Sequence, residues 1–212
     1  GIGGNDFVLL VGSTQENEDR MALAAFQQLH RSVPFLKLIL VPRHPDRCGR
    51  LARIIDEQGL SYSFRSRLNS TSSNTDRRIL VVDVIGELND WWGCADVGYV
   101  GGSLGGRGGQ NMIEPAARGI PICFGPDTSN FRDVVQMLLA DQAAVVVENA
   151  AQLQQFVCGV IGNPDSAAAM GRRAAELVGS QQGAASRTVA LLRTLLSTHR
   201  STHRSTRLRQ AA

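Results

Sequence analysis

Six glycines crowd into residues 101–109 of the sequence, and an apolar run stands on either side of them, at Val97–Val100 and at residues 120–124. Glycine accepts positive φ and lets a ligand lie against bare backbone N–H groups. A stretch of small residues that suits a helix separates the glycines from the second run. The segment therefore predicts a strand, a glycine-rich loop, a helix N-terminus and another strand. An element of this kind usually holds a phosphate or a sugar nucleotide at the start of its helix.

A purely structural interpretation of the same segment remains open. Asn111 and Glu114 have the spacing of a capping box, with Asn111 as N-cap and Glu114 as the third helical residue. Pro115 is compatible with the first helical turn, where its missing N–H would be unpaired in any case. The number of glycines nevertheless favours a binding loop, because a plain turn needs only one or two.

Apolar runs alternate with helical patterns along the whole chain. We expect strands at residues 7–11, 36–41, 62–64, 79–82, 97–100, 120–124 and 143–147. Helices are predicted from residue 16, at 46–58, around Trp91 and Trp92, at 131–139, and from 150 to about 197 with breaks at 163–164 and 179–183. The polar stretch 66–78 reads as a surface loop. This alternation predicts an α/β domain, with a Rossmann-like parallel sheet and helices on both of its faces.

Glycine and polar residues follow four of the predicted strands at the point where each strand ends. In a parallel sheet these carboxyl ends lie at one edge, where ligands bind. The segments that meet there are Gly12 with Ser13, Arg43 with His44, residues 83–87 and residues 101–111. Independent structural turns would not all select the same edge, so this convergence is the strongest sequence indication of a ligand site.

The side chains at this edge suit a nucleotide with a single phosphate. Arg43 can pair with a phosphate through its planar guanidinium, and His44 either assists it or is an ordinary turn residue. Ser13 and Ser103 offer hydroxyls, and Glu114 can accept both hydrogen bonds of a ribose diol. The sequence has no P-loop and no Gly-x-Gly-x-x-Gly at its first strand-to-helix turn, so ATP and NAD fit poorly. Clustered metal ligands are also missing from the sequence, so we expect no metal.

The excess of positive charge lies in the last residues of the chain. The sequence has 22 Lys and Arg against 19 Asp and Glu, but residues 197–212 hold four arginines and no acids. The remainder is close to neutral, which argues against a nucleic-acid partner. We therefore expect a domain at residues 1–196 and a solvated, disordered tail at 197–212. The alternative for the tail is attraction to an anionic membrane surface.

The four cysteines are widely spaced and form no CxxC pair. They are predicted to be small core residues of a protein in a reducing compartment, which argues against a disulfide framework or a zinc site. No apolar stretch approaches the roughly 18 to 20 residues of a membrane span, and no signal peptide is visible. The chain begins at Gly1 and enters an apolar strand almost at once. We therefore expect a fragment of a longer protein that is soluble by itself.

Seven short motifs follow one another at residues 12–18, 41–45, 83–88, 100–103, 108–111, 114–116 and 125–131, the last comprising Gly-Pro and Asn-Phe. Together they resemble the Kdo (3-deoxy-D-manno-octulosonic acid) transferases of Gram-negative lipopolysaccharide synthesis. Single motifs of this kind are shared by many GT-B glycosyltransferases, whereas seven in the family's order are specific.

The resemblance implies the carboxyl-terminal, donor-binding half of a GT-B fold. The family's donor is CMP-Kdo, and its acceptor is a lipid A precursor at the cytoplasmic face of the inner membrane. The family's amino-terminal domain carries the membrane anchor, the acceptor surface and the general base, so no catalytic residue is expected in this chain, and neither cofactor nor metal. Carried over by position, the residues expected to contact CMP are Arg43, Ser103, Asn111 and Glu114. Those expected to line the donor site are Gly12, Ser13, His44, Gly86, Glu87, Leu88 and Gly109.

Two departures from the family's pattern concern the same region. Gln110 stands where the family usually has histidine, and Gln15 and Asn17 replace the more usual histidine and glycine. The first affects the donor site, so the resemblance supports CMP binding more strongly than it supports Kdo as the sugar. A GT-B enzyme that uses a UDP-sugar and a nucleotide-binding module without catalysis remain alternatives.

Overall fold

The computed structural model describes residues 2–68, 77–181, 183, 188–189 and 191–194. The chain divides into two compact units, Gly1–Val178 and Gly179–Ala212, and the fold described below is that of the first. The predicted tail at 197–212 lies outside the described residues, as does most of the predicted loop at 66–78. The boundary that we expected after residue 196 therefore stays a prediction.

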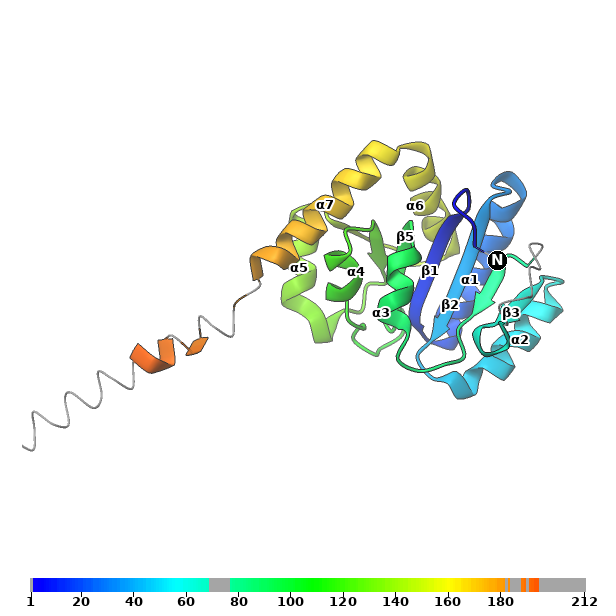
Figure 1. The fold of residues 1–212 in the computed structure, drawn as a ribbon, viewed down its shortest axis with the longest axis horizontal. Coiled ribbons are helices and arrows are strands. Elements are labelled where there is room, and N and C mark those ends of the chain that lie inside the picture. The colour runs from blue at the N-terminus through cyan, green and yellow to red at the C-terminus, as the bar shows by residue number, and fades with distance from the viewer. Residues whose placement is uncertain (1, 69–76, 182, 184–187, 190, 195–212) are drawn as a thin grey trace, which may run out of the picture. The chain divides into compact units, whose positions relative to one another are not determined.

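The centre of the fold is a seven-stranded sheet in which every paired strand is parallel to its neighbours, in the order β3-β4-β2-β1-β5-β6-β7 (Figure 1). The strands are β1 (Phe7–Thr14), β2 (Leu36–Pro42), β3 (Tyr62–Phe64), β4 (Ile79–Val81), β5 (Val97–Val100), β6 (Ile122–Phe124) and β7 (Ala144–Val146). Each predicted strand is present, and the α/β prediction is confirmed. The first strand of the chain, β1, is fourth in this order and therefore occupies the centre of the sheet, where it pairs with β2 and β5.

Helices cover both faces of this sheet, as predicted. The helices are α1 (Glu16–Ser32), α2 (Cys48–Glu57), α3 (Leu88–Trp91), α4 (Ile113–Ala117), α5 (Arg132–Ala140), α6 (Ala150–Gly162) and α7 (Pro164–Gln181). Short 3₁₀ turns lie at Pro45–Arg47, Arg65–Arg67, Trp92–Cys94 and Ser129–Phe131. The first of these turns occupies the start of the helix predicted at 46–58, because Pro45 sets a tight turn before α2.

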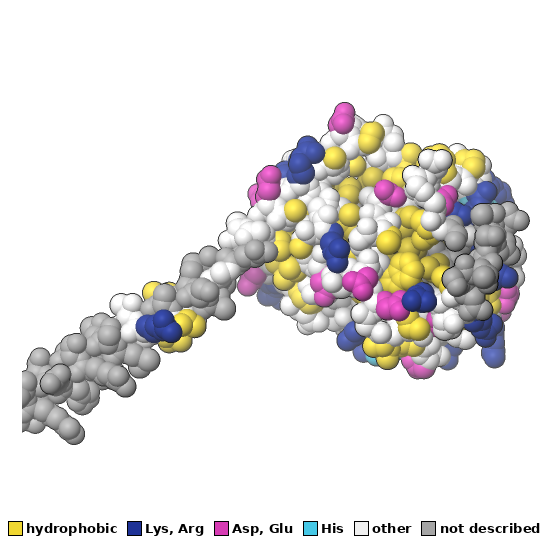
Figure 2. Space-filling model, viewed as in Figure 1, with side chains coloured by type: hydrophobic (Ala, Val, Ile, Leu, Met, Phe, Trp, Pro, Cys, Tyr) yellow, Lys and Arg dark blue, Asp and Glu magenta, His cyan; other side chains and the backbone are white. Residues whose placement is uncertain are grey.

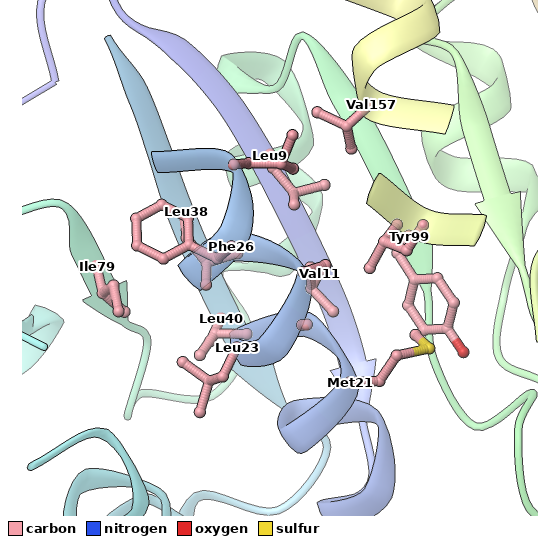
Figure 3. Close-up of a cluster of buried hydrophobic side chains, with 14 of the residues drawn as sticks. Leu9, Val11, Met21, Leu23, Phe26, Leu38, Leu40, Ile79, Tyr99 and Val157 are labelled. Carbon is pink, nitrogen blue, oxygen red and sulfur yellow. The ribbon is translucent and has the colours of Figure 1, made fainter. Parts of the chain in front are cut away.

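Strand alternation divides the buried side chains into two clusters, one on each face. On one face α1, α2 and α6 pack on the sheet, and Figure 3 shows side chains of this cluster, with Phe26 of α1 close to Leu38 of β2. On the other face α3, α4, α5 and part of α7 cover the sheet around the buried Trp92. Burial on both faces explains why β1, and β2 apart from Lys37, read as apolar runs rather than as alternating ones.

The cysteine prediction is half right. Cys48 and Cys123 are buried and all four residues are free thiols. Burial raises the pKa of the Cys48 thiol to about 11 and that of Cys123 well above its ordinary value. Cys94 and Cys158 are exposed, so for these two the core assignment is wrong. Cys94 ends a surface 3₁₀ turn, and Cys158 lies on α6 next to the buried Val157, on the solvent side of an amphipathic helix.

Charged side chains of both signs share the visible surface of the molecule, with apolar side chains between them (Figure 2). No helix among the described residues is long and apolar enough to span a membrane.

Candidate functional site

The loops that follow β1, β2 and β5 are bonded to one another at the carboxyl edge of the sheet. The N–H of Arg43 donates to the carbonyl of Thr14 at 3.1 Å, and the N–H of Gly101 donates to the carbonyl of Gly12 at 2.8 Å. Pairing between β1 and β2 shifts register between Gly12 and Thr14, where Ser13 has a φ of 56°. The structure thus brings together three of the four predicted segments, those that follow β1, β2 and β5, around a distortion of the backbone at the end of β1.

The end of β1 is also packed too closely for side chains at two glycines. A Cβ on Gly12 would lie 2.7 Å from the ring of Trp92, and one on Gly101 would lie 2.6 Å from the carbonyl oxygen of Ser13. Both glycines are therefore required for packing at this edge. The ring of Trp92 packs against Gly12, which is one of the residues predicted to line the donor site.

A buried carboxylate organises the first half of the glycine-rich loop. The Glu18 side chain is fully buried at the start of α1, and the backbone N–H groups of residues 102, 103 and 104 donate to it at 2.8, 2.9 and 3.1 Å. The hydroxyl of Tyr99 and the N–H of Gln15 donate to the same carboxylate at 3.0 and 2.8 Å. Burial, together with the charge of Glu18, raises the pKa of Tyr99, so its hydroxyl stays protonated as a donor.

The hydroxyl of Ser103 is part of this buried arrangement. Ser103 is fully buried, its hydroxyl donates to the carbonyl of Val100 at 2.7 Å, and it accepts from the N–H of Gly125 at 2.7 Å. The hydroxyl that we expected to face a ligand is therefore used inside the protein, where it ties the end of β5 to the end of β6. A direct contact between Ser103 and a donor stays a prediction.

The second half of the loop is held from the segment after β6. The carboxylate of Asp127 accepts from the N–H of Gly108 at 2.9 Å, and this bond is the main reason why the pKa of Asp127 is lowered. The side-chain amide of Asn130 donates to the carbonyl of Arg107 at 2.8 Å. Gly108 and Gly109 have φ values of 76° and 83°, which L side chains rarely adopt. The loop is thus fixed at both ends, and the exposed Arg107 lies between them.

A second buried carboxylate links β1 to the chain after β2. Asp19 accepts from the hydroxyl of Thr14 at 2.5 Å and forms an ion pair with Arg47. Arg47 also donates to the carbonyl of Thr14 at 2.8 Å. Burial raises the pKa of Asp19, although the contacts with Thr14 and Arg47 oppose the rise. These contacts lock the turn that carries Arg43.

Arg43 and His44 are both exposed at the end of β2. Within the part of the chain that the structure describes, the guanidinium of Arg43 forms no hydrogen bond or ion pair. Its backbone, in contrast, is tied to Thr14. An exposed, unpaired arginine on a fixed backbone suits the recognition of an anion.

The turn at residues 86–88 is fixed by its own carboxylate. Glu87 accepts from Arg65 at 3.0 and 3.2 Å and from the indole N–H of Trp91 at 3.1 Å. Gly86 has a φ of 92°, and Ile85 before it is 86 % exposed. The backbone of this turn is available to a ligand, whereas the carboxylate of Glu87 is engaged by protein groups.

Asn111 and Glu114 contact each other, but not as the predicted capping box. The helix begins at Ile113, with Met112 as its N-cap. The side-chain oxygen of Asn111 accepts from the N–H of Ile113 at 3.0 Å, and its amide donates to Oε1 of Glu114 at 3.0 Å. The capping-box assignment is wrong because the helix starts one residue later than expected, so that Met112 and not Asn111 is the N-cap. Oε2 of Glu114 accepts no hydrogen bond from the described residues.

The sequence reasoning missed the residues that support the loop, namely Glu18, Asp19, Asp127 and Asn130. From the sequence alone, Glu18 and Asp19 are only part of the helix predicted from residue 16, and acids in a first helical turn are common for that reason. Their position directly after the end of β1 was the available signal, because an acid there can reach the loop of the neighbouring strand. Nothing in the local pattern distinguished Asp127 from an ordinary turn residue.

A cavity of about 930 Å³ lies elsewhere, beside β3 and the start of β4. Tyr62, Phe64, Arg67 and Trp91 are among its lining residues, and it includes none of the predicted donor-site residues. The candidate site is therefore defined by the convergence of loops and not by this cavity. The described residues contain no group of three or more His, Cys, Asp or Glu that could hold a metal ion.

The fold and the loop arrangement define a Rossmann-like domain of the kind found as the carboxyl-terminal half of GT-B glycosyltransferases. In sequence, the chain is 34% identical over 188 residues to a 3-deoxy-D-manno-octulosonic acid transferase of Bordetella pertussis, covering 87% of the chain. It is 31% identical over 190 residues to the transferase of that name from Haemophilus influenzae, covering 89% of the chain. The chain spans 44% of the length of each of these curated relatives. No family model matches it.

A solved structure matches nearly the whole domain. It is the C-terminal CMP-Kdo binding domain of WaaA from Acinetobacter baumannii, which superposes with a TM-score of 0.77 at 27% identity. The match covers 82% of this chain and 90% of that one. The chain is therefore a relative of the Kdo transferases and corresponds to their carboxyl-terminal domain, and the resemblance seen in the motifs is confirmed.

Proposed function

We propose that this chain is the donor-binding half of a glycosyltransferase that transfers Kdo from CMP-Kdo to a lipid A precursor. The observation that carries the proposal is the match to nine tenths of the CMP-Kdo binding domain of WaaA. The arrangement of the loops supports it, because an exposed arginine and a rigid glycine-rich loop lie at the carboxyl edge of the sheet. The acceptor and the membrane are contacted through the rest of the full-length protein, at the cytoplasmic face of the inner membrane.

In this proposal each exposed group at the edge has one role. Arg43 binds the phosphate, Glu114 accepts from the ribose hydroxyls, and Asn111 holds Glu114 in place. Backbone groups at residues 12–13, 86–88 and 109 line the remainder of the donor site, next to His44. Attack of an acceptor hydroxyl on the sugar releases CMP, whose phosphate gains negative charge as the bond breaks. An arginine beside that phosphate stabilises the charge without a metal ion.

Calorimetric titration of this chain with CMP, UMP and ADP tests the proposal. We expect CMP to bind most tightly, because the proposed donor carries cytidine. Tighter binding of UMP would favour a UDP-sugar enzyme, and equal weak binding of all three would refute a nucleotide donor site. We also expect no Kdo transfer by the chain alone, because the general base and the acceptor surface are proposed to lie outside it. Measurable transfer would contradict that part of the proposal.

Replacing Glu114 with glutamine is expected to weaken CMP binding by at least about 10-fold, since a hydrogen bond to a charged group contributes about 1.5 to 3 kcal/mol. Thermal stability should change little, because the N–H of Ile113 is capped by Asn111 and not by Glu114. Titration with CMP and a melting curve measure the two effects separately. A lower melting temperature with unchanged CMP affinity would show that Glu114 serves the helix and not the nucleotide.

A further inference from the structure

The carboxylate of Glu18 occupies the position in the glycine-rich loop where an anionic ligand would be expected. Three successive N–H groups, of residues 102–104, converge on it at 2.8 to 3.1 Å. Consecutive amides that converge in this way form an anion-binding nest. In this protein the anion in the nest is a side chain of the protein itself, and it is fully buried.

Both oxygens of the carboxylate are used. Oε1 accepts from the N–H groups of residues 103 and 104 and from the hydroxyl of Tyr99, and Oε2 accepts from the N–H groups of Gly102 and Gln15. Charge-assisted bonds of this kind are about twice as strong as neutral ones. A donor phosphate could reach these amides only by displacing Glu18, which would leave a buried charge without its partners.

We infer that Glu18 is a positioning residue for the donor: it fills the amide nest of residues 102–104 and so presents only the part of the loop beyond Leu104 to the nucleotide. The inference rests on the proposed function, since it specifies which part of the loop binds the donor. Beyond Leu104 the loop is exposed at residues 105–107, and Asp127 and Asn130 hold it in place. In this arrangement Arg43 and this outer part of the loop bind the phosphate of the donor.

Amide NMR of the ¹⁵N-labelled chain tests the inference directly. In the free protein, the amides of residues 102–104 should exchange slowly with solvent. Saturating CMP should shift amides in residues 105–111 clearly and those of residues 102–104 little. The largest CMP-induced shifts at residues 102–104, or rapid exchange of these amides in the free protein, would overturn the inference. Absence of any CMP binding in calorimetry would instead refute the proposed function, while the exchange rates would still report whether Glu18 fills the nest.

A pair of variants tests the role of the charge. In Glu18→Gln, either orientation of the amide places an NH₂ group against at least two donors, so the loop cannot keep its bonds. We expect CMP affinity to fall at least about 10-fold at a temperature at which circular dichroism shows the variant folded. The matched control is Glu16→Gln, two residues earlier on the same helix, where the carboxylate forms only exposed ion pairs. Its CMP affinity should stay within about 2-fold of the unchanged chain.

If Glu18→Gln does not fold, Tyr99→Phe replaces it, because that change removes one donor to the carboxylate and keeps the ring in the core. We expect a smaller loss of CMP affinity and faster exchange of the amides of residues 103 and 104, which share Oε1 with the hydroxyl. A folded Glu18→Gln chain with unchanged CMP affinity would overturn the inference. Unchanged amide exchange in Tyr99→Phe would do the same.

Discussion

Replacing Arg43 with alanine is expected to weaken CMP binding by about 10- to 100-fold and to leave the weak binding of cytidine nearly unchanged. The loss corresponds to a charge-assisted contact of about 1.5 to 3 kcal/mol. The guanidinium forms no bond with the described protein groups, so little of the folded state depends on it. Its backbone is bonded to Thr14, so the side chain starts from a fixed position. Parallel titrations with CMP and cytidine measure the two affinities.

Two further variants make the Arg43 result specific. Arg43→Lys should recover only part of the affinity, because a point charge cannot replace the planar fork of the guanidinium. Arg53→Ala, which removes an exposed arginine from the surface of α2, should leave both affinities unchanged. An equal loss for CMP and cytidine in Arg43→Ala would mean that Arg43 shapes the pocket and that the phosphate binds to the loop instead.

Replacing Gly125 with alanine is expected to destabilise the domain by about 1 to 3 kcal/mol or more, the usual range for overpacking. A Cβ at this position would lie 2.3 Å from the carbonyl oxygen of Ser103 and 3.0 Å from the N–H nitrogen of Leu104. These are backbone atoms of the glycine-rich loop, which cannot yield as a flexible side chain would. The added methyl group should therefore displace the backbone of the loop, and this displacement should weaken CMP binding as well. Urea denaturation and CMP titration measure the two effects.

The matched control for this substitution is Gly49→Ala. Gly49 lies in α2, and a Cβ there would meet no atom within 4 Å. Alanine is favoured over glycine inside a helix by about 1 kcal/mol, so this variant should be slightly more stable than the unchanged chain and should bind CMP equally well. A Gly125→Ala chain that matched it in stability would show that the loop moves freely, against the close packing described above.

The fold was predictable because its signal is carried by long local patterns. The strand β2 is seven residues long, apolar except for Lys37 and wholly buried, so its sequence identifies it without knowledge of its neighbours. The short element at Ile113 was placed less well, because its five residues contain too little periodicity to fix a boundary. Cys94 and Cys158 show the same limit, since small neighbours in the sequence do not tell which side of a helix or turn faces solvent.

The candidate site was predictable only in its outline. The rule that parallel strands end at one edge brings Gly12, Arg43 and the glycine-rich loop together, and the structure shows this convergence. The sequence could not show that Glu18 reaches a loop 84 to 86 residues later in the chain. It could not show either that the Ser103 hydroxyl points inward. Such contacts depend on the packing of whole elements, which no local pattern records.

The packing of α6 against α1 has a consequence for how the protein is made. Leu153 and Val157 of α6 belong to the same buried cluster as Met21 and Ala25 of α1. During synthesis α1 emerges from the ribosome more than a hundred residues before α6, the helix that packs against it. At the 5 to 20 residues per second typical of translation, the apolar side of α1 waits about 6 to 26 seconds for α6. Over that interval the nascent chain exposes apolar side chains of α1. Binding of chaperones to the nascent chain should therefore decrease once α6 has emerged from the ribosome.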